Sequence, residues 1–152
     1  MERLKNHGAF VAVLRGRNTV VSKDLVVHFL PRGGFDTPDV EGIRPERRMG
    51  LAVSKAVGNA VTRNAVKRRL RVLARTHEGL LPRSCDIVMR ARPSAARASF
   101  QSLDSQVVRC FGNISRSRKI RDAHGATAKH GTHVNRAVTT TSDTASKREI
   151  GA

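Results

Sequence analysis

The chain has 152 residues, of which 29 are Lys or Arg and 12 are Asp or Glu, so its formal net charge is +17. This length suits one domain, with or without a tail, and small folded domains usually carry a net charge of about 2–8 units. Self-repulsion at +17 would destabilise the compact state unless an anionic partner neutralises it. Nucleic acid, an anionic lipid surface or an acidic protein could be that partner.

Several classes of protein are excluded at this stage. No run approaches the roughly 18 apolar residues of a membrane span, and the N-terminus has no apolar core of a secretory signal. Two cysteines, Cys85 and Cys110, are too few for a disulfide scaffold. We therefore expect a cytoplasmic protein, without a membrane partner, whose cysteines are reduced, buried thiols.

The composition changes near Gly112. Residues 113–152 contain no Leu, Phe or Met and carry a net charge of +5, whereas residues 1–112 hold all five Phe and carry +12. A segment with so little apolar surface cannot offset the entropy cost of ordering. The composition predicts a folded basic domain over residues 1–112 and a disordered basic tail over residues 113–152.

The first element of the domain is predicted to be a short amphipathic helix over about residues 3–15. Phe10, Val13 and Leu14 follow helical spacing, and Gly16 is a plausible stop. Alternating apolar residues then predict three strands, over residues 24–31, 48–54 and 86–91. Residues 19–22 could form one more short strand.

Between and after these strands the pattern changes. Residues 31–46 hold three Pro and three Gly and predict a solvated loop. Helical patterns cover residues 59–76 and the region after Ser99, a plausible N-cap. Strands separated by helices indicate an α/β or α+β domain with a small sheet.

The segment 47–77 is the most informative part of the chain, because it contains nine Lys and Arg and no Asp or Glu. On a helix, the apolar residues of this segment gather on one side. The opposite side is formed by Arg63, Asn64, Lys67, Arg68, Arg71 and Arg75. A solvated basic face is the ordinary explanation of a charge run. Here like charges four residues apart repel each other without any nearby acid to relieve them, which favours phosphates bound against the helix.

The turn before this helix adds to the same interpretation. Gly58 permits an unusual backbone conformation, and Asn59 is a reasonable N-cap. The helix N-terminus then attracts anions, and Lys55 stands just before the turn. The segment does not contain the G-x-x-x-x-G-K-S/T pattern of a Walker A loop.

The sequence from Arg48 to Arg71, R-M-G-L-A-V-S-K-A-V-G-N-A-V-T-R-N-A-V-K-R-R-L-R, resembles the signature of the bacterial ribonuclease P protein component. The part of that signature that aligns here is S-K-x-x-G-N/K-A-V-x-R-N-R/K-x-K-R-x-x-R. The matching positions are Ser54, Lys55, Gly58, Asn59, Ala60, Val61, Arg63, Asn64, Lys67, Arg68 and Arg71. The departure is Ala65, where many members carry a second Arg.

Shorter matches outside the signature extend the resemblance over about residues 3–111. Phe10 followed by Leu14 and Gly16 is similar to the N-terminal pattern of the family. Arg92-Pro93 after the last strand, then Ser99-Phe100 and Leu103, is similar to its C-terminal pattern. The tail lies outside the resemblance, and it could add non-specific phosphate affinity or contact something else.

The resemblance implies an α+β fold with an N-terminal helix, a small mixed β-sheet, and a C-terminal helix. It also implies that the basic helix lies in a left-handed β-α-β crossover, although such connections are right-handed by default. For function, the resemblance implies that the chain is a subunit of ribonuclease P. In this endoribonuclease the RNA subunit removes the 5′ leader of precursor tRNA. Magnesium ions would be held mainly by the RNA, and no obligate protein partner is expected.

Carried over by position, the resemblance assigns two groups of residues. The first would contact the catalytic RNA, and consists of Lys55, Arg63, Asn64, Lys67, Arg68 and Arg71. The second would line a cleft for the precursor-tRNA leader, and consists of Phe10, Leu14, Val26, His28 and Arg92. Phe10 could stack on a base or only pack the first helix onto the sheet. His28 could stack, or be a solvated strand histidine.

The residues show no catalytic constellation and no set of metal ligands with recognisable spacing. This agrees with chemistry performed by RNA. Two other hypotheses remain open at this stage: a ribosomal-protein-like RNA-binding module without a role in cleavage, and a helix-turn-helix DNA-binding protein using residues 54–75. The β character of the flanking segments argues against the second.

Overall fold

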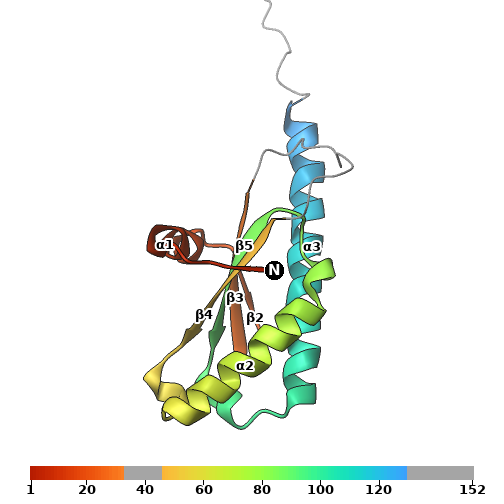
Figure 1. Ribbon diagram of the computed structural model, residues 1–152. Helices are drawn as coiled ribbons and strands as arrows, with labels where there is room; N and C mark the ends of the chain where they lie inside the picture. Colours follow the sequence, from red (N-terminus) through yellow and green to blue (C-terminus); the bar gives the residue numbers. More distant parts are fainter. Residues whose placement is uncertain (33–45, 130–152) are drawn as a thin grey trace, which may run out of the picture. The chain divides into compact units, whose positions relative to one another are not determined.

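The structure is a computed structural model that describes the backbone of residues 1–32 and 46–129 and the side chains of residues 1–32 and 46–117. Five strands form one mixed sheet in the order β1-β4-β5-β3-β2 (Figure 1). The strands are β1 (Glu2–Arg3), β2 (Thr19–Val21), β3 (Leu25–Pro31), β4 (Arg47–Val53) and β5 (Cys85–Ala91). β4 is parallel to β1 and β5, whereas β3 is antiparallel to β2 and β5.

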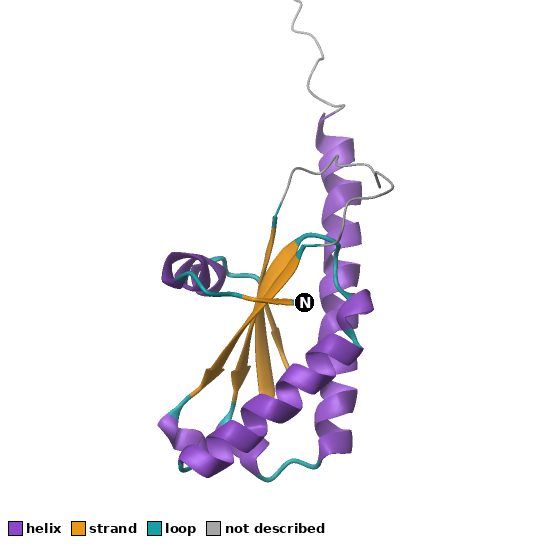
Figure 2. Ribbon diagram, in the orientation of Figure 1, coloured by secondary structure: helices purple, strands orange, loops and turns teal. Residues whose placement is uncertain are grey.

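Three helices pack around this sheet (Figure 2). They are α1 (His7–Arg15), α2 (Ala60–Thr76) and α3 (Phe100–Lys129), with short 3-10 turns η1 (Lys55–Val57), η2 (Glu78–Leu80) and η3 (Pro93–Ala96). The predicted strands and the predicted helix at residues 59–76 are confirmed. Within the described residues, none of these helices has the length and apolar content that crossing a membrane requires.

The start of the first helix differs from the sequence prediction. Residues 2–3, expected to begin that helix, form β1 and pair with Arg48 and Met49 of β4. The helix begins only at His7, because the Asn6 side chain caps it by accepting a hydrogen bond of 2.7 Å from the Gly8 amide. The cap therefore separates a strand segment from a helix within seven residues.

The α2 helix connects two adjacent parallel strands, β4 and β5. In Figure 1 both strands run downward and α2 lies in front of the sheet, while the end of β5 lies to the right of the end of β4. This is the left-handed arrangement of a β-α-β crossover. The fold class that the resemblance implied is thus confirmed, including its unusual connection.

The sheet buries apolar residues on both faces. On one face, Leu25, Val27 and Phe29 of β3 join residues of α2 and α3 in the main core. On the other face, Val13 of α1 packs with Val88 of β5 in a smaller cluster. α1 therefore covers one face of the sheet, and α2 and α3 cover the other.

The last helix continues beyond the predicted domain boundary at residue 112. α3 runs to Lys129, and Ile114 is completely buried in the main core. The spacing of its buried residues explains this, because Ile114 follows Leu103, Val107 and Phe111 on one helical face. The absence of Leu, Phe and Met after residue 112 does not mark the end of the core, because Ile114 continues the apolar face of the helix. Residues 130–152 of the expected tail lie outside the described residues.

Replacing Ile114 with Ala should lower the free energy of unfolding by about 2–5 kcal/mol, the range for truncating a buried Ile. The measurement is urea unfolding followed by circular dichroism. Arg116→Ala, an exposed site two residues away, is the matched control and should change stability by less than about 0.5 kcal/mol. Equal midpoints for the two variants would show that the core ends before Ile114.

Candidate nucleic-acid interface

The turn that leads into α2 is built by local hydrogen bonds. The Asn59 side chain accepts a hydrogen bond of 2.9 Å from the Thr62 amide and so caps the helix, as predicted. Gly58 has a φ of 153°, and a Cβ there would lie 3.0 Å from the Thr62 side chain, so glycine fits this position. Lys55 opens the preceding η1 turn and is exposed.

The sides of α2 are divided as the sequence predicted. Val66, Leu70, Leu73 and Ala74 are 0–1% exposed and face the main core. The polar side carries the predicted contact residues: Asn64, Arg68 and Arg71 are exposed, and Arg63 and Lys67 are half-buried. The structure thus brings five of the six residues assigned to the catalytic RNA onto one helix, with Lys55 just before it.

These cations have no ion-pair partner within the described part of the chain. The acidic residues that form ion pairs do so with other groups. Asp86, for example, accepts two hydrogen bonds of 2.7 and 2.8 Å from Arg48 on the neighbouring strand, and these raise the pKa of Arg48. The cationic side of α2 is therefore available to an external anion.

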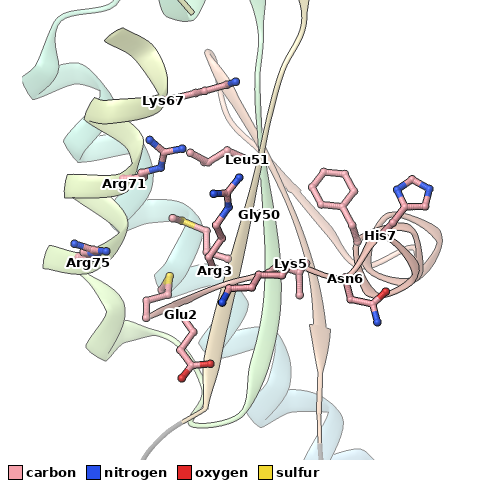
Figure 3. Close-up of a pocket in the computed structure, with 14 residues that line it drawn as sticks. Glu2, Arg3, Lys5, Asn6, His7, Gly50, Leu51, Lys67, Arg71 and Arg75 are labelled. Atoms are coloured by element: carbon pink, nitrogen blue, oxygen red, sulfur yellow. The ribbon is translucent and has the colours of Figure 1, made fainter. Parts of the chain in front are cut away.

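An open cleft of about 390 Å³ lies beside α2. It is distinct from the sheet face assigned to the leader, and no motif in the sequence predicts it. Its walls are the N-terminal segment and the α2 side chains Lys67, Arg71 and Arg75, and its floor is Gly50 and Leu51 of β4 (Figure 3). No local pattern could have revealed it, because the parallel pairing of β1 with β4 joins segments about 45 residues apart.

Four of the five residues assigned to the leader, namely Phe10, Leu14, Val26 and His28, lie on or against the sheet face that α1 covers in part. Strand pairing aligns Gly50, Val88, His28 and Thr19 in one row across the sheet, and Ala52, Arg90, Val26 and Val21 in the next. Phe10 and Leu14 of α1 pack in the Val88 cluster on this face. In the second row Arg90 and Val21 are exposed, and Ala52 and Val26 are half-buried.

His28 is held in place on this face. Its Nδ1 lies 3.3 Å from the Thr19 hydroxyl, and its buried Nε2 has no hydrogen-bond partner within the described chain. Burial and the neighbouring Arg90 charge lower the pKa of His28, which favours the neutral imidazole. A neutral half-buried ring is suited to apolar contact rather than to phosphate binding.

Arg92 is the assigned residue that the structure does not bring to α1. It follows the end of β5, and its guanidinium donates hydrogen bonds of 3.3 and 3.4 Å to the carbonyls of Ser22 and Lys23. Arg90, two residues earlier, is exposed in the row beside Val26. On this face Arg90 is therefore better placed than Arg92 to meet an anion.

Potential catalytic groups are few in the described residues. No group of three or more His, Cys, Asp or Glu that could hold a metal ion occurs there. Cys85 and Cys110 are buried and are not joined to each other by a disulfide, as predicted. Burial raises the pKa of Cys110, which leaves it a poor nucleophile.

Comparison with known proteins adds an independent line of observation. The family model described as Ribonuclease P matches residues 1–115. The chain is 42% identical over 113 residues to the ribonuclease P protein component of Salinispora tropica, covering 67% of this chain and 82% of that protein. It is 37% identical over 138 residues to that of Thermobifida fusca, covering 87% and 92%.

Two solved structures are similar in fold. The RNase P protein of Thermotoga maritima matches with a TM-score of 0.62 and 24% identity, over 75% of this chain and 98% of that chain. The RNase P protein of Staphylococcus aureus matches with a TM-score of 0.56 and 24% identity, over 78% and 96%.

Gly50 allows Phe10 to lie directly on the sheet, because a Cβ at Gly50 would be 2.7 Å from the Phe10 ring. Gly50→Ala should therefore lower the free energy of unfolding by about 1–3 kcal/mol, as measured by urea unfolding. Gly79→Ala is the control, since its Cβ would meet nothing within 4 Å, and it should stay within about 1 kcal/mol of the parent.

A double-mutant cycle identifies the ring as the cause. In a Phe10→Ala background the Gly50→Ala substitution should cost less, with an interaction energy of about 0.5–3 kcal/mol. Equal costs in both backgrounds would contradict the contact.

Proposed function

We propose a function on the premise that the chain belongs to the ribonuclease P protein family, whose model covers residues 1–115. The chain is the protein subunit of a ribonuclease P ribonucleoprotein. It binds the catalytic RNA subunit and the 5′ leader of precursor tRNA, and so assists the RNA in cutting the leader from the mature tRNA end. The complex acts in the cytoplasm.

The observation that carries this proposal is the cationic side of α2, which has no ion-pair partner among the described side chains. Structured RNA is recognised largely through shape, phosphates and 2′-hydroxyl groups. Arg and Asn offer directional donors to those groups. The residues that contact the catalytic RNA are Lys55, Arg63, Asn64, Lys67, Arg68 and Arg71.

The leader binds on the sheet face beside α1. Phe10, Leu14 and Val26 supply apolar surface for its bases, and His28 contributes a neutral ring. Arg90 meets its backbone in place of Arg92, whose guanidinium is engaged by two carbonyls. Single-stranded nucleic acid needs this combination of apolar platform and cationic rim.

The chain's own residues contribute binding and orientation rather than bond cleavage. Among the described residues no cluster of side chains is suited to a metal ion. The magnesium ions that cleavage requires are held mainly by the RNA. A helix-turn-helix DNA-binding function is disfavoured, because α2 is flanked by strands β4 and β5 rather than by a partner helix.

Reconstitution with the cognate catalytic RNA tests the proposal. At low magnesium, the protein should increase the rate of 5′ processing of a precursor tRNA above that of RNA alone. Arg68→Ala should weaken binding to the catalytic RNA and reduce the log–log salt slope by about 0.7–0.9, the loss of one phosphate contact. Arg109→Ala, an exposed arginine on α3, is the control and should leave the slope unchanged.

The two measurements distinguish failure of the proposed function from failure of one assigned contact. Absence of stimulation by the parent protein would refute the proposed function. Stimulation together with an unchanged slope for Arg68→Ala would refute direct phosphate contact at that residue only.

Phe10→Ala should selectively weaken binding of precursor tRNA relative to mature tRNA by about 5–150-fold, the loss of one base–aromatic stack of about 1–3 kcal/mol. The measurement compares affinities of the reconstituted complex for the two tRNAs. Phe10→Leu retains much of the packing on Gly50 but cannot stack, and should show the same selectivity. Equal losses for both tRNAs would indicate that Phe10 serves only to pack α1.

A further inference from the structure

The N-terminal segment, residues 1–7, has a fixed position beside α2. The Met1 amino group lies 2.7 Å from a Glu78 carboxylate oxygen, and the Leu4 amide donates a hydrogen bond of 2.9 Å to the Met49 carbonyl. Leu4 is only 7% exposed, and the Asn6 cap fixes the end of the segment. A segment tied at four points holds its charged side chains in defined places.

The pairing of β1 with β4 determines where these side chains point. Arg3 pairs with Met49, whose side chain belongs to the main core on the α2 face. Paired residues share a face and successive residues alternate, so Arg3 and Lys5 face α2 whereas Leu4 faces α1. Figure 3 shows Arg3 extending into the space next to α2.

The opposite wall of the cleft presents Lys67, Arg71 and Arg75 from α2. Their spacing of four residues places them on one face of the helix, about 6 Å apart along its axis. That spacing is comparable with the repeat of successive phosphates along one RNA strand. None of these three, nor Arg3 or Lys5, has an ion pair among the residues that the structure describes.

The floor of the cleft adds a backbone donor. β1 ends at Arg3, and beyond it no other strand of the described residues lies beside β4 on that edge. The Met49 carbonyl points to that edge, and Leu51, two residues later, therefore presents its amide in the same direction. The lining thus combines five cationic side chains and an open strand edge with one acidic side chain, Glu2. The cations are Arg3, Lys5, Lys67, Arg71 and Arg75.

We propose that this cleft binds the phosphodiester backbone of one strand of the catalytic RNA, which makes Arg3, Lys5 and Arg75 RNA-binding residues beyond those of the signature. The inference rests on the proposed function and extends its interface from α2 to the N-terminal segment. The catalytic RNA is the occupant because the cleft is continuous with the cationic side of α2 through Lys67 and Arg71. Val26 and His28, assigned to the leader, lie on the opposite face of the sheet, and of the leader residues only Phe10 reaches the border of the cleft.

The test compares two variants that remove equal charge. The cleft variant carries Arg3→Gln, Lys5→Gln and Arg75→Gln, and the control variant carries Arg15→Gln, Arg109→Gln and Arg116→Gln. All six positions are exposed, so circular dichroism and urea midpoints should match those of the parent. Binding to the catalytic RNA alone is measured over a range of salt concentrations.

The cleft variant should bind the catalytic RNA at least tenfold more weakly than the control variant near 0.1 M salt. Its log–log salt slope should fall by about 2–3, corresponding to about three lost phosphate contacts. In a second experiment, the reconstituted complex is given precursor tRNAs with leaders of different lengths. The dependence of affinity on leader length should be the same for the cleft variant and the parent.

Two results would overturn the inference while leaving the proposed function intact. One is a slope and affinity equal to those of the control variant, when the parent protein does bind the catalytic RNA. The other is a loss that appears only with leader-bearing substrates, which would assign the cleft to the leader. Failure of the parent protein itself to bind the catalytic RNA would refute the proposed function and this inference with it.

Discussion

The burial of one side of α2 against the sheet is the constraint on which the rest of the interface depends. Val66, Leu70 and Leu73 are at most 1% exposed, and burial of each such side chain stabilises the fold by about 1.5–3 kcal/mol. Repulsion between cations four residues apart costs only about 0.2–0.5 kcal/mol per pair. Packing therefore wins by a wide margin, and the fold holds a row of like charges together without needing an internal counter-ion.

The placement of the acidic residues completes this separation of charge. Five of the six acids with described side chains find their partners away from the polar side of α2: Asp24 with Gln106, Glu46 with Arg32, Glu78 with the Met1 amino group, Asp86 with Arg48, and Asp104 with His77. The sixth, Glu2, lies in the cleft beside α2. These contacts link strands, turns and helix ends, so the acids serve the fold. The net positive charge is consequently concentrated on α2, and Arg3 and Lys5 of the N-terminal segment lie beside it. Because no internal acid neutralises these cations, they attract an external polyanion.

Local patterns in the sequence were sufficient for α2, its Asn59 cap and the strands, because helical and alternating periodicities depend only on near neighbours. They failed where a distant segment decides the structure. β1 has two residues and no period of its own; it exists because β4 offers an edge. The composition of residues 113–152 also concealed one residue in helical register, Ile114, which is buried in the main core. Local patterns also could not show that the Arg92 guanidinium donates hydrogen bonds to carbonyls about 70 residues away, at the β2–β3 turn.

The aromatic content sets the balance between charge and stacking in any RNA complex of this protein. The chain has no Trp or Tyr and five Phe, and of these Phe29 and Phe111 are buried in the main core. Each base–aromatic stack contributes about 1–3 kcal/mol, so Phe10 can supply one such contribution at the border between the cleft and the sheet face. The remaining affinity must come from neutralised phosphates, which makes it strongly dependent on salt. On the proposed function, Phe10 supplies stacking to the leader, whereas binding of the catalytic RNA rests mainly on the cationic side of α2.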